Sequence, residues 1–153
     1  MSKRRKANSR RPGHPGWLRR LGPVPGVVQL YLRGGGTVAV SIPDATREAI
    51  SAHLQRVIVG IENERIPRCP HVQPGTSEPF MASSSAAYCY KCPPEVMASL
   101  ALSGGDDRTC DVCRRCVDFP GGFTTVSSKV GTLTLLTATC EDCISEYETG
   151  IGR

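Results

Sequence analysis

The sequence predicts a small α+β protein in which an N-terminal ββα unit is followed by segments that bound metal ions stabilise. Three observations lead to this fold class. Of the 153 residues only 39% are hydrophobic and 5% aromatic, so the apolar core is modest. Eight cysteines occur in this short chain, and domains of this size often need metal ions or disulfides. Strand-like and helix-like patterns both occur between residues 27 and 66.

The expected ββα unit spans residues 27–66. Residues 27–32 and 37–42 are rich in β-formers, and the glycines at 34–36 between them indicate a hairpin. Asp44 is expected to cap a following helix. One apolar face of this helix should cover the hairpin, and it carries Ile50, Leu54, Val57, Ile58 and Ile61. We expect His53 to lie off that face as an exposed side chain.

A first set of metal-type residues defines a module over 67–105. Cys69 and His71 are followed by Cys89 and Cys92, which together offer three thiolates and one imidazole. Zinc favours tetrahedral sulfur and nitrogen ligands, and a two-residue gap lets two cysteines of one turn reach the same ion. Residues 95–102 after this set have a helix-like pattern.

A second set defines a module over 106–153. Cys110 and Cys113 are separated from Cys140 and Cys143 by 26 residues, which read as a hairpin of 123–127 and 132–137 turning at 129–131. Residues 144–148 are expected to form a terminal helix. A cysteine knuckle, a hairpin and ligands at a helix start resemble the layout of treble-clef zinc fingers, and the first module resembles them without a clear hairpin. This resemblance implies two treble-clef or zinc-ribbon-like modules but no particular partner.

Several alternatives to this ligand assignment stay open. Cys116 lies three residues after Cys113 and could replace Cys110 or Cys113; we treat it as a spare thiol. The basic start lacks the apolar stretch of a secretion signal, so a disulfide framework is disfavoured and a cytoplasmic location expected. Four cysteines in two pairs can also hold an iron–sulfur cluster, although the intervening hairpin favours zinc. We therefore expect two Zn²⁺ per chain.

No catalytic residue is predicted. Both ligand sets fill four positions, whereas catalytic zinc keeps one position open. Cys116 has no histidine nearby in the sequence, and no nucleotide-binding loop or small-molecule substrate site is evident. No segment reaches the roughly 20 apolar residues that span a bilayer, so no membrane association is expected.

Charge is divided unequally along the chain. No acidic residue precedes Asp44, and residues 1–43 hold nine basic side chains, whereas residues 44–153 hold ten basic and 14 acidic ones. Residues 1–26 should form a disordered basic arm that can neutralise phosphates. The candidate nucleic-acid contacts are Lys3, Arg4, Arg5, Lys6, Arg10, Arg11, Arg19, Arg20 and, on the second knuckle, Arg114 and Arg115.

Basic arm and zinc modules together predict a zinc-binding accessory or regulatory protein that associates with DNA or RNA. The alternative is a protein-interaction adaptor whose acidic zinc body docks on a protein partner, including a ribosome- or polymerase-associated role. These readings differ in whether the arm or the body makes the essential contact.

Overall fold

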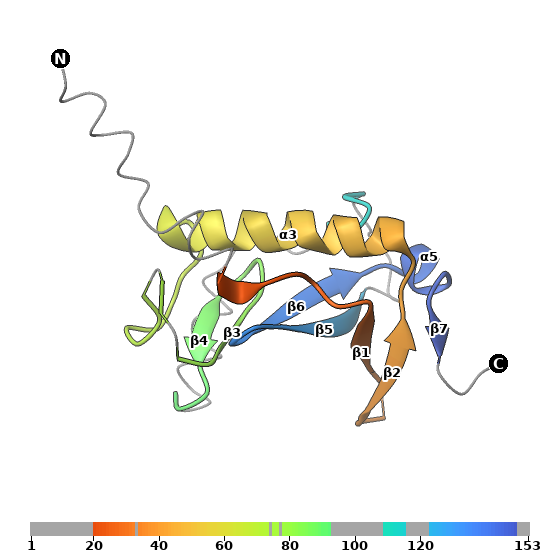
Figure 1. Cartoon of the computed structure of the whole chain (residues 1–153), viewed down its shortest axis with the longest axis horizontal. Coiled ribbons are helices and arrows are strands. Elements are labelled where there is room, and N and C mark those ends of the chain that lie inside the picture. The colour runs from red at the N-terminus through yellow and green to blue at the C-terminus, as the bar shows by residue number, and fades with distance from the viewer. Residues whose placement is uncertain are drawn as a thin grey trace, which may run out of the picture.

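The computed structural model describes residues 20–32, 34–73, 75–76, 78–92, 109–115 and 123–149, which form one seven-stranded sheet crossed by a long helix (Figure 1). This confirms the α+β class. The helix α3 spans Asp44–Glu62 and a short helix, α5, spans Glu141–Ile144. The strands are β1 (Val27–Tyr31), β2 (Thr37–Ser41), β3 (Phe80–Ala82), β4 (Ala87–Cys89), β5 (Thr124–Val130), β6 (Leu133–Thr139) and β7 (Glu148–Thr149).

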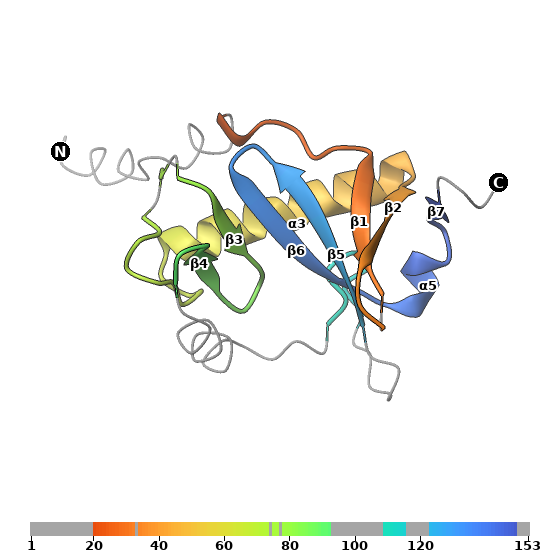
Figure 2. The ribbon, with the colours of Figure 1, turned by 90° about the horizontal axis from the view of Figure 1, so that it is seen from below.

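The sheet mixes segments from distant parts of the chain. Its order is β4-β3-β6-β5-β1-β2-β7, and each pair is antiparallel except β3 with β6 (Figure 2). The two expected hairpins are present, as β1–β2 and β5–β6. However, β1 also pairs with β5, so β1, β2 and α3 do not form a self-contained ββα unit. The predicted domain boundaries stay a prediction.

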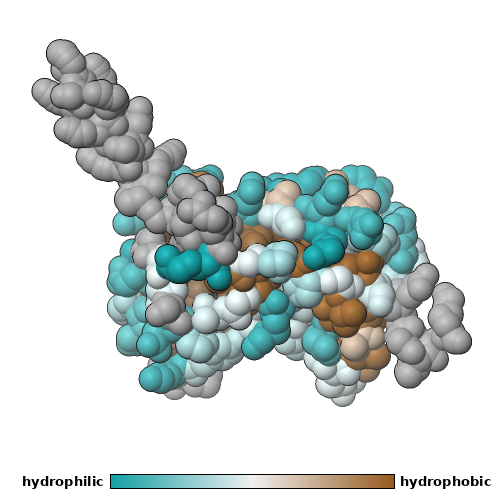
Figure 3. Space-filling model, viewed as in Figure 1, coloured by the Kyte–Doolittle hydropathy of each residue, from teal (hydrophilic) through white to brown (hydrophobic). Residues whose placement is uncertain are grey.

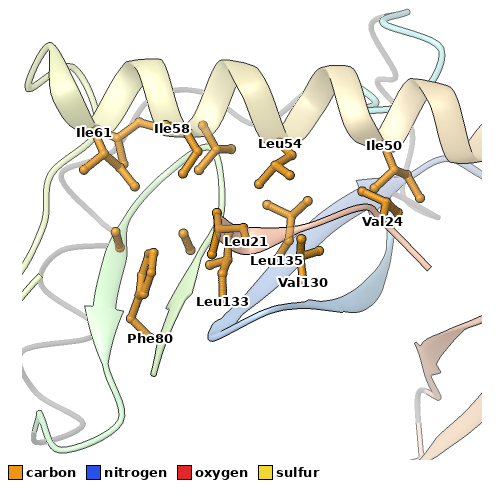
Figure 4. Close-up of a cluster of buried hydrophobic side chains, with 14 of the residues drawn as sticks. Leu21, Val24, Ile50, Leu54, Ile58, Ile61, Phe80, Val130, Leu133 and Leu135 are labelled. Carbon is orange, nitrogen blue, oxygen red and sulfur yellow. The ribbon is translucent and has the colours of Figure 1, made fainter. Parts of the chain in front are cut away.

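The hydrophobic core lies between α3 and one face of the sheet. Figure 4 shows Ile50, Leu54, Ile58 and Ile61 pointing from the helix toward Phe80, Val130, Leu133 and Leu135, and all eight side chains are buried. Side chains alternate between the two faces of the sheet along β5 and β6, and residues paired across the two strands share a face. Val126, Val130, Leu133 and Leu135 therefore all point to the face that packs against α3. The space-filling view in Figure 3 shows hydrophobic residues in a band below the helix.

The segment just before β1 packs onto this core. Leu21 and Val24 are 6% and 1% exposed, although residues 20–26 were expected to belong to the arm. The β5–β6 turn lies against this segment. Gly131, at φ +62°, would place an added Cβ only 2.7 Å from the Leu21 carbonyl oxygen. A glycine is therefore required both by the backbone conformation and by the close approach.

Three local expectations were wrong. Asp44 is the first residue of α3 rather than its N-cap, because Pro43 occupies the N-cap position. No side chain makes a capping hydrogen bond there. His53 is 1% exposed. It stands three residues after Ile50 and four before Val57, which places it on the buried face. The terminal helix covers 141–144, and Glu148–Thr149 instead forms β7 beside β2.

Other expectations fall outside the described residues: the arm up to residue 19, the helix over 95–102, and Cys116. Within the described part of the chain, no helix is both long and apolar enough to cross a membrane.

Candidate metal centres

The first candidate centre joins a loop to the end of a hairpin. Cys69 and His71 precede β3, and Cys89 and Cys92 stand at and just after the end of β4. His71 Nδ1 lies 3.5 Å from Cys89 Sγ and 3.6 Å from Cys92 Sγ, and these two sulfurs are 3.5 Å apart. Cys69 Sγ accepts the Cys89 backbone N–H at 3.4 Å. The β3–β4 hairpin thus brings both halves of the predicted set together.

The second candidate centre joins a knuckle to the start of α5. Cys110 and Cys113 bracket the turn, while Cys140 follows β6 directly and Cys143 lies within α5. The Sγ distances are 4.0 Å for Cys110–Cys143, 3.8 Å for Cys113–Cys140 and 3.7 Å for Cys140–Cys143. Cys110 Sγ also accepts the N–H groups of Val112 and Cys140, at 3.4 and 3.3 Å.

These separations fit one tetrahedral ion in each centre. In each set the four ligand atoms lie within 4.8 Å of one another. Zn–S bonds of about 2.3 Å set sulfurs about 3.8 Å apart in a tetrahedron, and a Zn–N bond of about 2.0 Å sets nitrogen about 3.5 Å from sulfur. The seven described cysteines are free, and their separations far exceed the roughly 2.05 Å of a disulfide. Each group can therefore hold a metal ion.

Burial and mutual proximity make the thiols of these centres titrate unequally. Burial, together with Cys69 and Cys89 beside it, raises the pKa of Cys92 to about 12. Burial acts to raise the pKa of Cys113 too, but hydrogen bonds from the backbone and side chain of Arg115 outweigh it and lower that pKa to about 6. A cation would stabilise the three thiolates of the first centre or the four of the second, and a divalent metal can supply that charge.

A buried polar bridge connects the second centre to α3. The Asp111 carboxylate accepts the Ala138 N–H through Oδ2 at 2.8 Å, and the same oxygen lies 3.6 Å from His53 Nε2. His53 Nε2 also donates to the Leu136 carbonyl oxygen at 3.1 Å, and Arg56 donates to the Asp111 carbonyl oxygen at 3.0 Å. Burial lowers the pKa of His53, and the weaker effect of Asp111 opposes it. His53 is therefore neutral at pH 7.

The structure describes three of the ten basic residues predicted to contact nucleic acid. Arg20 donates to the Gly75 carbonyl oxygen at 2.6 Å. Arg114 is exposed, with its guanidinium 4.0 Å from Asp111 Oδ1. Arg115 donates to Cys113 Sγ at 3.4 Å and to Asp142 Oδ2 at 3.1 Å, so its guanidinium braces the second centre. The others, Lys3, Arg4, Arg5, Lys6, Arg10, Arg11 and Arg19, lie outside the described residues.

Sequence reasoning missed two features that build the centres. The β3–β4 hairpin was not foreseen because each strand has three residues; the serines at 83–85 between them were the available signal of a turn. The role of Asp111 was not foreseen either. A carboxylate inside a C-x₂-C knuckle carries no local sign of the distant backbone N–H group that it accepts.

Fold and sites define a class: an α+β protein with two Cys-rich centres, each able to hold a metal ion. Comparisons with protein-family models, with curated proteins and with solved structures found no match.

Proposed function

We propose that this chain binds two structural zinc ions and associates with nucleic acid as an accessory or regulatory protein. The tetrahedral spacing of the two donor sets is the observation that supports zinc. Thiolate and imidazole donors suit Zn²⁺, and four protein ligands per ion leave no open position for catalysis. In this proposal the protein is not an enzyme. Free thiols at these separations suit a reducing compartment such as the cytoplasm.

The proposal assigns the second centre to the treble-clef class. Its knuckle at 110–113, the β5–β6 hairpin and the ligand positions at the start of α5 follow that layout. Hairpin β3–β4 gives the first centre a comparable arrangement, which the sequence alone did not suggest. The ions would hold the chain segments at both ends of each hairpin.

Charge division supports the nucleic-acid part of the proposal. The nine basic residues before Asp44 have no acidic residue among them in that part of the sequence, which supports contact with phosphates. Contacts of this kind release counterions and read little sequence. The expected binding is weakly selective and strongly dependent on salt.

The test uses the full-length chain with six arm residues changed to glutamine: Lys3, Arg4, Arg5, Lys6, Arg10 and Arg11. Deleting residues 1–22 is unsuitable, because Leu21 belongs to the core. For five phosphate contacts on duplex DNA, the log–log salt slope should be about −4 to −5, and neutralising these six residues should make it much less steep. A control variant with the arm residues permuted keeps the charge and should bind like the wild type. Equal binding by the neutralised and wild-type chains would refute the nucleic-acid proposal.

A second candidate function is that of a protein-interaction adaptor, and exposed apolar side chains favour it. Val27, Tyr31 and Leu32 are 53%, 42% and 48% exposed, and a hydrophobic group lies over β1 and β2 in Figure 3. Changing Tyr31 and Leu32 to serine should then abolish capture of a protein partner, whereas neutralising the arm should not. The nucleic-acid proposal predicts the reverse.

A further inference from the structure

A cleft with a cavity volume of about 580 Å³ lies between one side of α3 and the knuckle of the second centre. The knuckle, residues 109–115, passes alongside α3 in Figure 1. Helix α3 contributes seven residues between Ala52 and Gly60, the following turn contributes Arg65 and Ile66, the β3–β4 turn contributes Ser84, and the knuckle contributes Asp111 and Arg114. This size falls within the range of about 300 to 1,000 Å³ that is typical of small-ligand sites.

Positive charge is concentrated in this cleft. Arg56, Arg65 and Arg114 line it, although residues 44–153 as a whole carry more acidic than basic side chains. Among the described lining residues Asp111 is the one acidic side chain, and it is 5% exposed. Its Oδ2 already accepts the Ala138 N–H at 2.8 Å. The cleft therefore holds an excess of cations over anions.

Two of these arginines are held near each other by the fold. Arg56 donates to the Asp111 carbonyl oxygen at 3.0 Å, and the Arg114 backbone N–H donates to the Cys110 carbonyl oxygen at 2.9 Å with φ at +66°. Burial lowers the pKa of Arg56, and the charge of Arg114 lowers it further. Two like charges placed this way repel each other, so a bound anion would be stabilised by both.

We infer that this cleft binds a phosphate ester of about the size of one nucleotide. Guanidinium groups pair with phosphate oxygens through two parallel hydrogen bonds, and three arginines line this cleft: Arg56, Arg65 and Arg114. The volume exceeds what a phosphate group alone fills, and Ala52, Val59 and Ile66 offer an apolar wall for the rest of the ester. The phosphate belongs either to a free nucleotide or to a nucleic-acid strand. Only binding of a strand rests on the proposed function.

The experiment measures binding to the zinc-loaded full-length chain by titration calorimetry with two probes, adenosine 5′-monophosphate and a short oligothymidine strand. Variants are Arg65→Gln, Arg114→Gln and the pair Arg56→Gln/Arg65→Gln. Lys129→Gln is the matched control, since it removes one exposed positive charge from β5 outside the cleft. Zinc content and circular dichroism establish that each variant is folded.

The expected result is at least about tenfold weaker binding of one or both probes for the cleft variants, because each loses charge-assisted hydrogen bonds. Binding by Lys129→Gln should be unchanged. Loss of mononucleotide binding identifies a free phosphate ester as a ligand, and loss confined to the strand identifies nucleic acid. The inference is overturned if neither probe binds, or if cleft and control variants bind alike. Even then, the proposed function would be supported if the wild-type chain binds the strand and the variant with the neutralised arm does not.

Discussion

His53 illustrates how much a single position depends on partners that are distant in the sequence. Its place in α3 follows the apolar spacing, but its polar atoms need Leu136 and Asp111, which lie more than 50 residues away. A buried imidazole is tolerated when its N–H group finds an acceptor. His53 Nε2 has one in the Leu136 carbonyl oxygen, so the helix is fixed to β6 at this point.

His53 should make stability depend on pH. Its pKa is lowered in the folded chain, so the unfolded chain binds a proton that the folded one does not as pH falls below about 6.5. The free energy of unfolding should therefore decrease below that pH. Urea unfolding of wild type and His53→Gln at pH 7.5 and 5.5 should show a smaller decrease in the variant. His14 and His71 are present in both chains, so their contributions cancel. An equal or larger decrease in the variant contradicts this role.

The cysteines of the second centre should differ from Cys116 in their effect on metal content. Cys140→Ser removes a ligand and should lower zinc content by about one equivalent. Cys116→Ser should leave two zinc ions per chain. Elemental analysis of the purified variants makes the comparison. If Cys116→Ser loses zinc while Cys110→Ser or Cys113→Ser retains it, the knuckle uses Cys116 instead.

At the scale of elements, the β5–β6 turn depends on its glycine in two ways. Gly131 has a left-handed φ of +62°, and the Leu21 backbone leaves no space for a Cβ. Gly36 in the β1–β2 turn also has a left-handed φ, of +85°, but an added Cβ there would meet nothing within 4 Å. Substitutions in the two turns can therefore be compared to distinguish the cost of backbone strain from the cost of a steric clash.

Gly131→Ala should lower the free energy of unfolding by about 2 to 4 kcal/mol, since strain and overlap with Leu21 add. Gly36→Ala should cost only the strain, roughly 1 to 2 kcal/mol. Chemical denaturation of both variants measures the difference. Equal losses in the two variants would mean that Leu21 does not pack against the turn.

Elements with long patterns were predictable from the sequence, and short ones were not. The helix at 44–62 and the hairpins β1–β2 and β5–β6 rest on runs of β-branched or regularly spaced apolar residues. Strands β3, β4 and β7, of two or three residues, exist because neighbouring strands complete their hydrogen bonds. Both metal sets were visible because the C-x-H and C-x₂-C spacings are local, whereas the bridge through Asp111 depends on the tertiary fold.

Over the whole molecule, both centres are continuous with one sheet. Cys89 ends β4 and Cys140 follows β6, while β3 joins the two hairpins through its parallel pairing with β6. The Tyr90 hydroxyl also hydrogen-bonds the Thr134 hydroxyl on β6. The order of the strands could not have been predicted, because nothing local specifies that β3 pairs with β6.

Loss of one ion should therefore weaken strands beyond its own centre. Cys92→Ser, which removes a ligand of the first centre, should accelerate amide hydrogen exchange in β6 as well as in β3 and β4. Exchange measured by mass spectrometry on the zinc-loaded proteins tests this, with Cys116→Ser as the control. Unchanged protection in β6 would show that the first centre unfolds independently of the rest of the sheet.

The pairing of β1 with β5 has a consequence for synthesis. About a hundred residues separate these strands, so β1 and β2 leave the ribosome long before β5 is translated. Until then, the edge of β1 that will receive β5 carries unpaired backbone groups, and Val28 and Val40 lack part of their core. Non-local pairing of this kind slows folding and exposes partly folded chains to aggregation. The nascent chain is therefore exposed to aggregation until residue 130 has emerged.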